Sequence, residues 1–376
     1  MTQGVERRNL VSANWVLVLL TLVLAAIGLL NLYSASVVRL GEGTSVAAYF
    51  QKQCLWMIIG VFCMFFCMFL DYRRLISSAE PMLVLSVLLL LLLLFFGPDM
   101  GGVKRWIPLG PVNFQPSEAV KISVMLLGAK LLAKGKDPLT WREFFPILSV
   151  GFVPAVLVLK QPDLGTAIII MFILGGMMLY RGLKAQIIKV GVLVLILSPL
   201  AVDKLIMPRL LDYQRARITG FLSPEKAPAK AVYQSDQSRI AIGSGKIWGK
   251  GYLEGTQSKL RFIPARHTDF ALAVFGEEWG FTGCVALMTL FCLFLLSIYT
   301  TIRETKDRFG GMLGAGIFFY FFWQILINVG MVLGLMPVVG IPLPFISYGG
   351  SSAVVNFCMV GLLLNISMRR FVFRAA

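Results

Sequence analysis

The sequence predicts an all-α polytopic membrane protein with about ten transmembrane helices and one large extracytoplasmic loop. Composition gives the first support: hydrophobic residues make up 57% of the 376 residues, only 14% are charged, and the mean hydropathy is +0.80. A soluble domain of this length could not cover that much apolar surface, whereas lipid can. The second support is the length of the apolar runs, because a helix needs roughly 20 residues to cross about 30 Å of hydrocarbon.

Ten segments match the length and composition of membrane spans. The fourth carries charged residues, and the fifth and sixth are separated only by residues 160–163, so the boundaries and the count are approximate. The predicted spans are residues 13–33, 53–70, 79–97, 118–133, 144–159, 164–180, 185–206, 270–299, 310–336 and 345–367.

Lysine and arginine fall mainly on one side of this arrangement. They include Arg7, Arg8, Arg370 and Arg374 near the termini, and the positive-inside rule therefore predicts that both termini are cytoplasmic. The first span lacks an A-x-A-like cleavage site near its end, so we expect a retained helix and not a signal peptide. We expect residues 1–376 to form a single integral membrane domain, with residues 207–268 as its only sizeable extramembrane element.

The 207–268 loop is strongly basic, although topology does not require its charge, since long loops are largely exempt from the positive-inside rule. Two interpretations stay open: a basic surface that attracts a phosphate-bearing lipid, or an ordinary solvated loop. Nucleic acid is a poor candidate on that side of a membrane. The glycine-rich stretch 243–251 suggests tight turns with exposed N–H groups, which would suit an anion. It does not match a Walker loop, because Ser244 stands where the first glycine is required.

Cysteine and histidine exclude several kinds of chemistry. All six cysteines fall within predicted spans, and their spacing indicates neither a disulfide framework nor a metal site. The single histidine, His267, has no second histidine or cysteine beside it, which argues against a zinc hydrolase. The composition leaves a Ser-His-Asp triad open, although the sequence contains no nucleophile-elbow motif.

Ionisable residues at membrane depth are costly and are therefore candidate functional groups. Glu118 and Lys121 are three residues apart, so they share a helix face and form either a structural ion pair or part of a cavity. Asp163 begins a helix and is either a cap or a functional carboxylate. Glu277 and Glu278 are adjacent on a helix, so at most one of them shares a side with Asp269.

Asp269 is the most informative acid, because it lies where the polar loop meets an apolar segment. A carboxylate at such a junction contacts both water and a low dielectric, which suits a proton acceptor for a lipid-linked substrate. The alternative is a helix cap, whose carboxylate would bind N–H groups and retain little basicity. His267 is a candidate for orienting it through a hydrogen bond. The prolines and glycines of residues 337–352 break any continuous helix, so we expect this segment to line a cavity near Asp269.

Four segments resemble the signature blocks of the SEDS family (shape, elongation, division and sporulation) in the family's order. They are residues 114–118 (FQPSE), 161–166 (QPDLGT), 267–270 (HTDF) and 342–352 (PLPFISYGGSS). Residues 255–258 and the short termini resemble the RodA-like branch more than the FtsW-like branch. The resemblance implies a ten-helix peptidoglycan glycosyltransferase of the bacterial cytoplasmic (inner) membrane. Such an enzyme polymerises lipid II at the outer leaflet and is partnered by a class B penicillin-binding protein.

The resemblance also assigns roles to residues. The catalytic aspartate of the family corresponds to Asp269, and its glutamate–lysine pair corresponds to Glu118 and Lys121. Asp163, His267 and Ser347 lie in the matching blocks and are expected to support the site.

The expected chemistry is an inverting transfer that forms β-1,4-linked glycan strands. Asp269 would be the general base for the acceptor hydroxyl, and pyrophosphate leaves without an acid. Fixed cations would stabilise the charge on the leaving pyrophosphate; the candidates are Arg215, Arg239, Lys246, Lys259 and Arg266. A divalent cation, Mg²⁺ or Mn²⁺, is an option that the sequence leaves open. A lipid II flippase and a non-catalytic scaffold for the penicillin-binding protein are the alternative functions.

Overall fold

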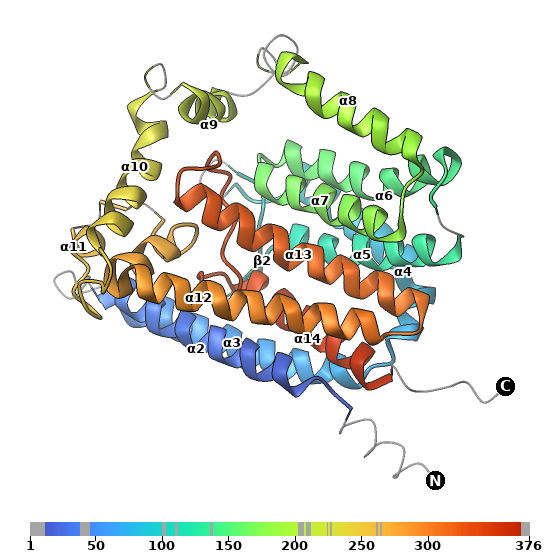
Figure 1. Cartoon of the computed structure of the whole chain (residues 1–376), viewed down its shortest axis with the longest axis horizontal. Coiled ribbons are helices and arrows are strands. Elements are labelled where there is room, and N and C mark those ends of the chain that lie inside the picture. The colour runs from blue at the N-terminus through green and yellow to red at the C-terminus, as the bar shows by residue number, and fades with distance from the viewer. Residues whose placement is uncertain are drawn as a thin grey trace.

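A computed structural model shows a bundle of long helices that lie roughly side by side, with shorter helices at one end (Figure 1). The structure describes residues 12–37, 46–99, 103–109, 112–135, 138–201, 207, 212–223, 225, 228–260, 262–263 and 265–369. The expectations placed on Arg7, Arg8, Arg370 and Arg374 lie outside these residues.

The long helices of the bundle follow the predicted spans in order. They are α2 (Trp15–Val37), α3 (Val46–Phe69), α4 (Leu75–Phe96), α5 (Pro116–Lys134), α6 (Trp141–Lys160), α7 (Leu164–Arg181), α8 (Ala185–Ala201), α12 (Ala271–Glu304), α13 (Arg308–Val332) and α14 (Gly350–Arg369). A 3-10 turn, η1 (Tyr72–Arg74), precedes α4. Eight segments among the described residues are long and apolar enough to cross a membrane, and the shorter apolar segment Ala185–Leu197 lies in α8. The predicted fold class is confirmed, and α5 and α8 are the two of the ten predicted spans that are not among these eight.

Helix α5 is less apolar than its neighbours because it lies inside the bundle. It packs against α4, α7 and α13, and most of its side chains are buried, including Glu118 and Lys121. Because protein and not lipid surrounds α5, its polar residues can be matched by polar partners from other helices. By contrast, α2, α3 and α4 expose apolar side chains such as Leu19, Phe62 and Phe96, as lipid-facing helices do.

The 207–268 region also contains helices. They are α9 (Asp212–Leu222), α10 (Ala229–Ser244) and α11 (Thr256–Lys259), and α10 packs on α12 (Figure 1). A short antiparallel hairpin, β1 (Ile107–Leu109) with β2 (Val112–Phe114), leads into α5, and Ile107 pairs with Phe114.

Helix α12 is interrupted at Gly280, whose backbone (φ 66°, ψ −164°) is non-helical. Residues 245–251 dock into this break. Phe281 N donates to Lys246 O at 2.9 Å, Thr282 N to Ile247 O at 3.0 Å, and Lys250 N to Glu277 O at 3.0 Å. Both α12 and the docked segment need a glycine at this contact. A Cβ at Gly280 would overlap the nitrogen of Gly249, and a Cβ at Gly249 would overlap the carbonyl of Glu278.

This docking corrects the expectation that the glycine-rich stretch is an anion cradle. The N–H groups of Gly245, Lys246 and Gly249 bond within the stretch or to the end of α10, and those of Lys250 and Gly251 bond to α12 carbonyls. These N–H groups are therefore already occupied by protein acceptors, which the sequence pattern does not reveal.

Glu277 holds residues 250–258 against α12. Its side chain is fully buried and accepts hydrogen bonds from Lys250 Nζ at 2.6 Å, Thr256 Oγ1 at 3.1 Å and the backbone nitrogens of Gln257 and Ser258 at 2.9 and 3.3 Å. The neighbouring Glu278 accepts from Ser34 Oγ on α2, so the two glutamates serve different partners, as expected from their adjacency.

We predict that Gly280→Ala destabilises the protein by about 2–3 kcal/mol, because alanine is strained at this φ and its methyl group displaces Gly249. The measurement is the thermal unfolding midpoint of the purified protein in detergent. Gly175→Ala in α7 is the matched control, since no atom lies within 4 Å of the added Cβ there. Equal midpoints for the two variants would contradict this account of the break.

Candidate functional site

Asp269 lies two residues before α12, and its side chain is half-buried. The N-cap position of α12 is Phe270, which makes no side-chain capping bond, so the alternative of Asp269 as the cap of this helix is not supported. The backbone around it is fixed, because Asn328 Nδ2 donates to Asp269 O at 2.9 Å and to Ile341 O at 2.7 Å.

The segment between α13 and α14 passes directly beside this carboxylate. A Cβ placed on Gly340, which has φ 77°, would lie 3.3 Å from Asp269 Oδ2. Residues 337–349 are non-helical, as the prolines and glycines predicted. The expectation that this segment lies near Asp269 is therefore confirmed.

The surroundings of Asp269 make it an unusually weak acid. Burial raises its pKa to about 6, the positive charge of Arg217 opposes this shift, and the negative charge of Asp163 adds to it. A hydrogen bond from the Thr268 side chain and the charge of Arg105 also act to lower the pKa. A carboxyl group with a pKa near the working pH is suited to accept a proton.

Asp163 caps the N-terminus of α7, which is one of the two roles that the sequence left open for it. Its Oδ1 accepts from Thr166 N at 3.1 Å, and its Oδ2 accepts from Thr166 Oγ1 at 2.9 Å and from Gln115 Nε2 at 3.3 Å. These bonds bring two of the signature segments, residues 114–118 and 161–166, together beside Asp269.

Arg105 and Arg217 are functional candidates that the sequence analysis did not select. Arg105 Nε donates to Gln161 O at 2.9 Å and its Nη2 donates to Pro162 O, so it lies against the segment that carries Asp163. Arg217, on α9, acts on the Asp269 carboxylate electrostatically. The basic character of residues 207–268 is the only sequence signal for Arg217, and it does not indicate which of the loop's cations approaches Asp269.

Glu118 and Lys121 form the predicted ion pair, with Lys121 Nζ 2.7 Å from Glu118 Oε1. Both are almost fully buried, and Lys121 Nζ lies 5.0 Å from the centre of the Tyr320 ring on α13. Tyr320 donates to Asn356 Oδ1 at 2.6 Å, so the pair belongs to a polar network that joins α5, α13 and α14. Tyr320 and Asn328 are eight residues apart on α13, which places this network about 12 Å along the helix from Asn328 and Asp269.

His267 and Ser347 have structural contacts. The ring of His267 stacks on Tyr49, with 5.5 Å between ring centres, and His267 O accepts from Tyr348 N at 2.8 Å. Ser347 Oγ accepts from Leu343 N at 2.9 Å, which closes the turn around Phe345. Both residues thus hold the segment that passes beside Asp269.

The five basic candidates are not gathered at one place. Arg239 pairs with Asp236 on α10, and Lys259 lies 3.2 Å from Glu254; both pairs are solvent-exposed. Arg215 Nε donates to Met207 O at 3.1 Å. Arg266 is buried, and its Nε donates to Ala35 O on α2 at 3.1 Å, so it anchors the loop to the bundle. Lys246 is exposed at the end of α10.

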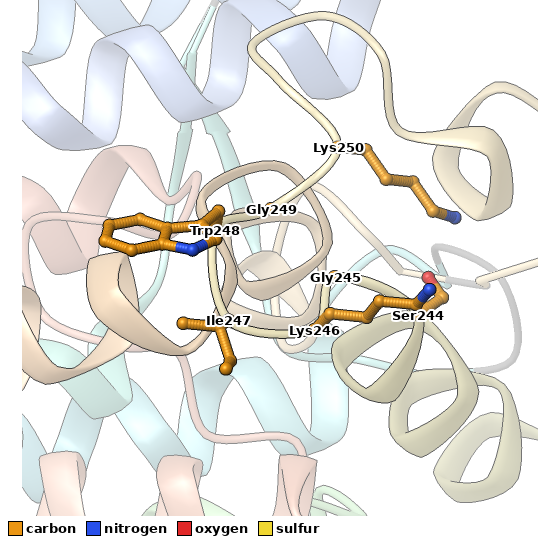
Figure 2. Close-up of a pocket in the computed structure, with 7 residues that line it drawn as sticks. All are labelled: Ser244, Gly245, Lys246, Ile247, Trp248, Gly249 and Lys250. Carbon is orange, nitrogen blue, oxygen red and sulfur yellow. The ribbon is translucent and has the colours of Figure 1, made fainter.

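Two hollows lie among these residues. A cavity of about 100 Å³ is lined by Arg217, Arg239, Gly334 and Val338 and lies next to the segment that reaches Asp269. A more open hollow of about 540 Å³ is lined by residues 244–250 (Figure 2). Figure 2 shows Lys246 and Lys250 extending in one direction and Trp248 in the opposite direction.

Among the described residues, no three histidine, cysteine, aspartate or glutamate side chains are placed to hold a metal ion. Asp163 and Asp269 are the two acids near each other at the site, and Asp163 is committed to its cap. The described residues thus provide no set of three such ligands for Mg²⁺ or Mn²⁺, and no step below depends on such an ion.

The fold and site define a polytopic membrane protein with a weakly acidic aspartate, flanked by arginines, at one end of its bundle. Comparison with known proteins gives the family: the model of the FtsW, RodA and SpoVE family, described as "Cell cycle protein", matches residues 14–371. The chain belongs to this family.

Relatives match over most of the chain. The sequence is 38% identical to peptidoglycan glycosyltransferase MrdB of Escherichia coli K12 over 76% of this chain and 77% of that protein. It is 30% identical to peptidoglycan glycosyltransferase RodA of Treponema pallidum over 96% and 99%. It is 35% identical to a probable peptidoglycan glycosyltransferase FtsW of Geobacter sp. M18 over 96% and 98%.

Solved structures agree with the sequence comparison. A chain from a peptidoglycan synthase complex that coordinates polymerisation and crosslinking is 31% identical, with a TM-score of 0.79 over 96% of this chain and 98% of that one. The rod shape determining protein RodA of Thermus thermophilus is 28% identical, with a TM-score of 0.70 over 96% and 98%.

We predict that Glu118→Ala destabilises the protein by about 3–5 kcal/mol, because it leaves the Lys121 ammonium buried without its counter-charge. The thermal unfolding midpoint in detergent measures this. The double variant Glu118→Leu with Lys121→Met removes both charges and is expected to recover most of the loss. A single variant as stable as the parent would show that the pair contributes nothing to the fold.

Proposed function

We propose that the chain polymerises lipid II into β-1,4-linked glycan strands, with Asp269 as the general base. The protein is a peptidoglycan glycosyltransferase of a bacterial membrane, in keeping with its family and relatives. The proposed role of Asp269 rests on the environment of its carboxylate. It is half-buried, does not cap α12, has its pKa raised to about 6, and lies beside two arginines.

The proposed reaction needs one base and several fixed positive charges. Asp269 accepts the proton of the acceptor sugar's 4-hydroxyl as that oxygen attacks the anomeric carbon of the donor. The bond to the lipid pyrophosphate breaks on the opposite side, so an α-linked donor gives a β-linked product. Pyrophosphate leaves as an anion and needs no acid, but the charge that develops on it requires cations fixed in place.

Cations are available at different distances from the base. Arg217 and Arg105 act on Asp269 directly, and Arg239 shares a cavity with Arg217. We assign the binding of the pyrophosphate mainly to Arg239 and Lys246. Arg215 and Lys259 are exposed candidates for its approach, and Arg266 contributes its charge from a buried position.

The polar network of Glu118 and Lys121 has a supporting role in this proposal. It fixes α5 against α13, the helix whose Asn328 holds the backbone of Asp269. Asp163, His267 and Ser347 position the segments that surround the base.

The proposal includes topology and a partner. Both termini are cytoplasmic, residues 207–268 are the extracytoplasmic loop of a single membrane domain, and the reaction takes place at the outer leaflet. A class B penicillin-binding protein crosslinks the strands; the similarity to a chain of a peptidoglycan synthase complex supports such a partnership. An assay of the reconstituted protein with lipid II as the sole substrate distinguishes the alternative functions. Glycan strands would indicate an enzyme, and movement of lipid II between leaflets would indicate a flippase. If neither is observed, the protein is a scaffold.

We predict that Asp269→Ala abolishes polymerisation of lipid II, by at least about a hundredfold in rate, because no other group accepts the hydroxyl proton. The assay follows glycan strands made by the purified chain with its penicillin-binding partner in proteoliposomes. The variant is expected to fold, since burial disfavours the ionised carboxylate that it removes.

Glu80→Gln is the matched control for this variant. Glu80 is a half-exposed acid paired with Lys130 at 2.5 Å, far from the site along the chain, and its loss should leave the rate unchanged. Substantial polymerisation by folded Asp269→Ala protein would refute the role of Asp269 as base.

The pH dependence follows from the raised pKa of Asp269. The base is active when ionised, so kcat/KM should be level above about pH 7 and fall about tenfold per pH unit well below pH 6. Asp163→Asn removes a negative charge that raises this pKa, so the fall should move to lower pH, whereas Arg217→Gln should move it to higher pH. Profiles of the two variants that shift in the same direction would contradict this electrostatic account.

A further inference from the structure

A long apolar groove runs between α10, α12 and α13. It has a volume of about 530 Å³. Its lining comes from the end of α10 with Lys246, from the face of α12 between Leu272 and Cys292, which includes Cys284 and Val285, and from Leu333 of α13. Lys246 is the single charged residue of this lining.

The depth of the groove in the membrane follows from α12. Between Phe281 and Ile302 this helix carries no Asp, Glu, Lys or Arg, whereas Glu277 and Glu278 precede it and Arg303 follows. The apolar part of α12 therefore begins at Phe281, beside Lys246, whose carbonyl accepts the Phe281 N–H at 2.9 Å. Lys246 and the exposed Trp248 are then at headgroup level, where lysine and tryptophan are favoured.

The lower part of the groove has the length of one leaflet. From Phe281 to Cys292 the helix rises about 16 Å, which is about half of the roughly 30 Å hydrocarbon thickness. A transmembrane helix of a partner would cross the whole membrane, whereas a lipid chain of one leaflet ends near its centre. The groove thus has the dimensions of a lipid chain.

The upper part of the groove leads to the site. Leu272 lies three residues after Asp269, and Leu333 is next to Gly334, which lines the cavity of Arg217 and Arg239. The Arg239 side chain packs on Gly334, since a Cβ there would lie 3.0 Å from Arg239 Cδ. Arg239 lies on α10 and lines this cavity, and Lys246 follows the end of α10 and lines the groove, so a positive charge lies at each of the two hollows.

We propose that the groove binds the isoprenoid chain of a lipid-linked substrate, with its diphosphate between Lys246 and Arg239 and its sugars directed toward Asp269. This rests on the proposed function and adds where the carrier chain lies. No acid of the described residues forms an ion pair with Lys246. The Arg239–Asp236 pair is exposed, so exchanging Asp236 for a diphosphate has little cost.

The first test fills the groove. Val285→Trp places a large ring in it, and Leu296→Trp, also on an exposed face of α12, is the matched control outside it. Polymerisation is measured in proteoliposomes with two substrates, one on an undecaprenyl chain and one on a single-isoprene chain that is too short to reach Val285, about 6 Å below Phe281. Val285→Trp should raise KM about tenfold or more for the undecaprenyl substrate only, because the long chain loses its buried apolar contacts.

Two results would overturn the proposal. One is an unchanged KM of Val285→Trp for the undecaprenyl substrate. The other is an equal rise for both substrates, which would indicate a distorted protein and not an excluded chain. Leu296→Trp is expected to change neither KM.

The second test does not depend on catalysis. Cys284 lines the groove one turn below Phe281, close to headgroup level, while Cys54 on α3 lies outside it. With Asp269→Ala protein in liposomes, undecaprenyl diphosphate should slow the reaction of Cys284 with N-ethylmaleimide severalfold and leave Cys54 unaffected. Protection would uphold the groove even if polymerisation proved not to be the function of the protein.

The same assay separates the competing occupants. Equal protection by phosphatidylglycerol would identify a general phospholipid site, and protection by the penicillin-binding partner alone would identify a helix-docking surface. Either result, or no protection by undecaprenyl diphosphate, would overturn the proposal.

Discussion

Helix α12 accepts residues 245–251 against its backbone only because Gly280 interrupts it, and the placement of the other functional elements follows from this contact. Above the break, α12 begins directly after Asp269, and below it the helix is apolar to Ile302. The docked segment brings the end of α10, with Lys246, to the boundary between these two parts. A polar loop and a lipid-facing helix are thereby joined by backbone hydrogen bonds, which do not depend on side chains that move.

The charges around Asp269 oppose one another, and this balance gives the carboxyl its basicity. Burial and Asp163 favour the protonated form, whereas Arg217, Thr268 and Arg105 favour the ionised form. Burial alone would raise the pKa of Asp269 further, and the arginines alone would lower it.

Local patterns in the sequence predicted local structure well. The three-residue spacing of Glu118 and Lys121 gave the ion pair, Asp163 gave a helix cap, and the prolines of residues 337–349 gave the irregular segment beside Asp269. Contacts between distant segments were not predictable. Arg266 resembles a solvated loop cation but is buried against Ala35 O, and Arg217 approaches Asp269 from α9. Such contacts depend on how the 207–268 region folds back on the bundle, which spacing does not encode.

The acids near this end of the bundle differ in what their oxygens already bind. Glu277 lies three residues before α12's break, and four donors from residues 250–258 occupy its carboxylate. Asp163 is occupied by the start of α7 and by Gln115. Asp269 has instead a fixed backbone, a half-buried carboxylate and a glycine, Gly340, beside its Oδ2. A larger side chain at Gly340 would fill the space in front of this oxygen. Of these three carboxylates, Asp269 is therefore the one whose oxygens the fold leaves open, and the proposed role as a base depends on this.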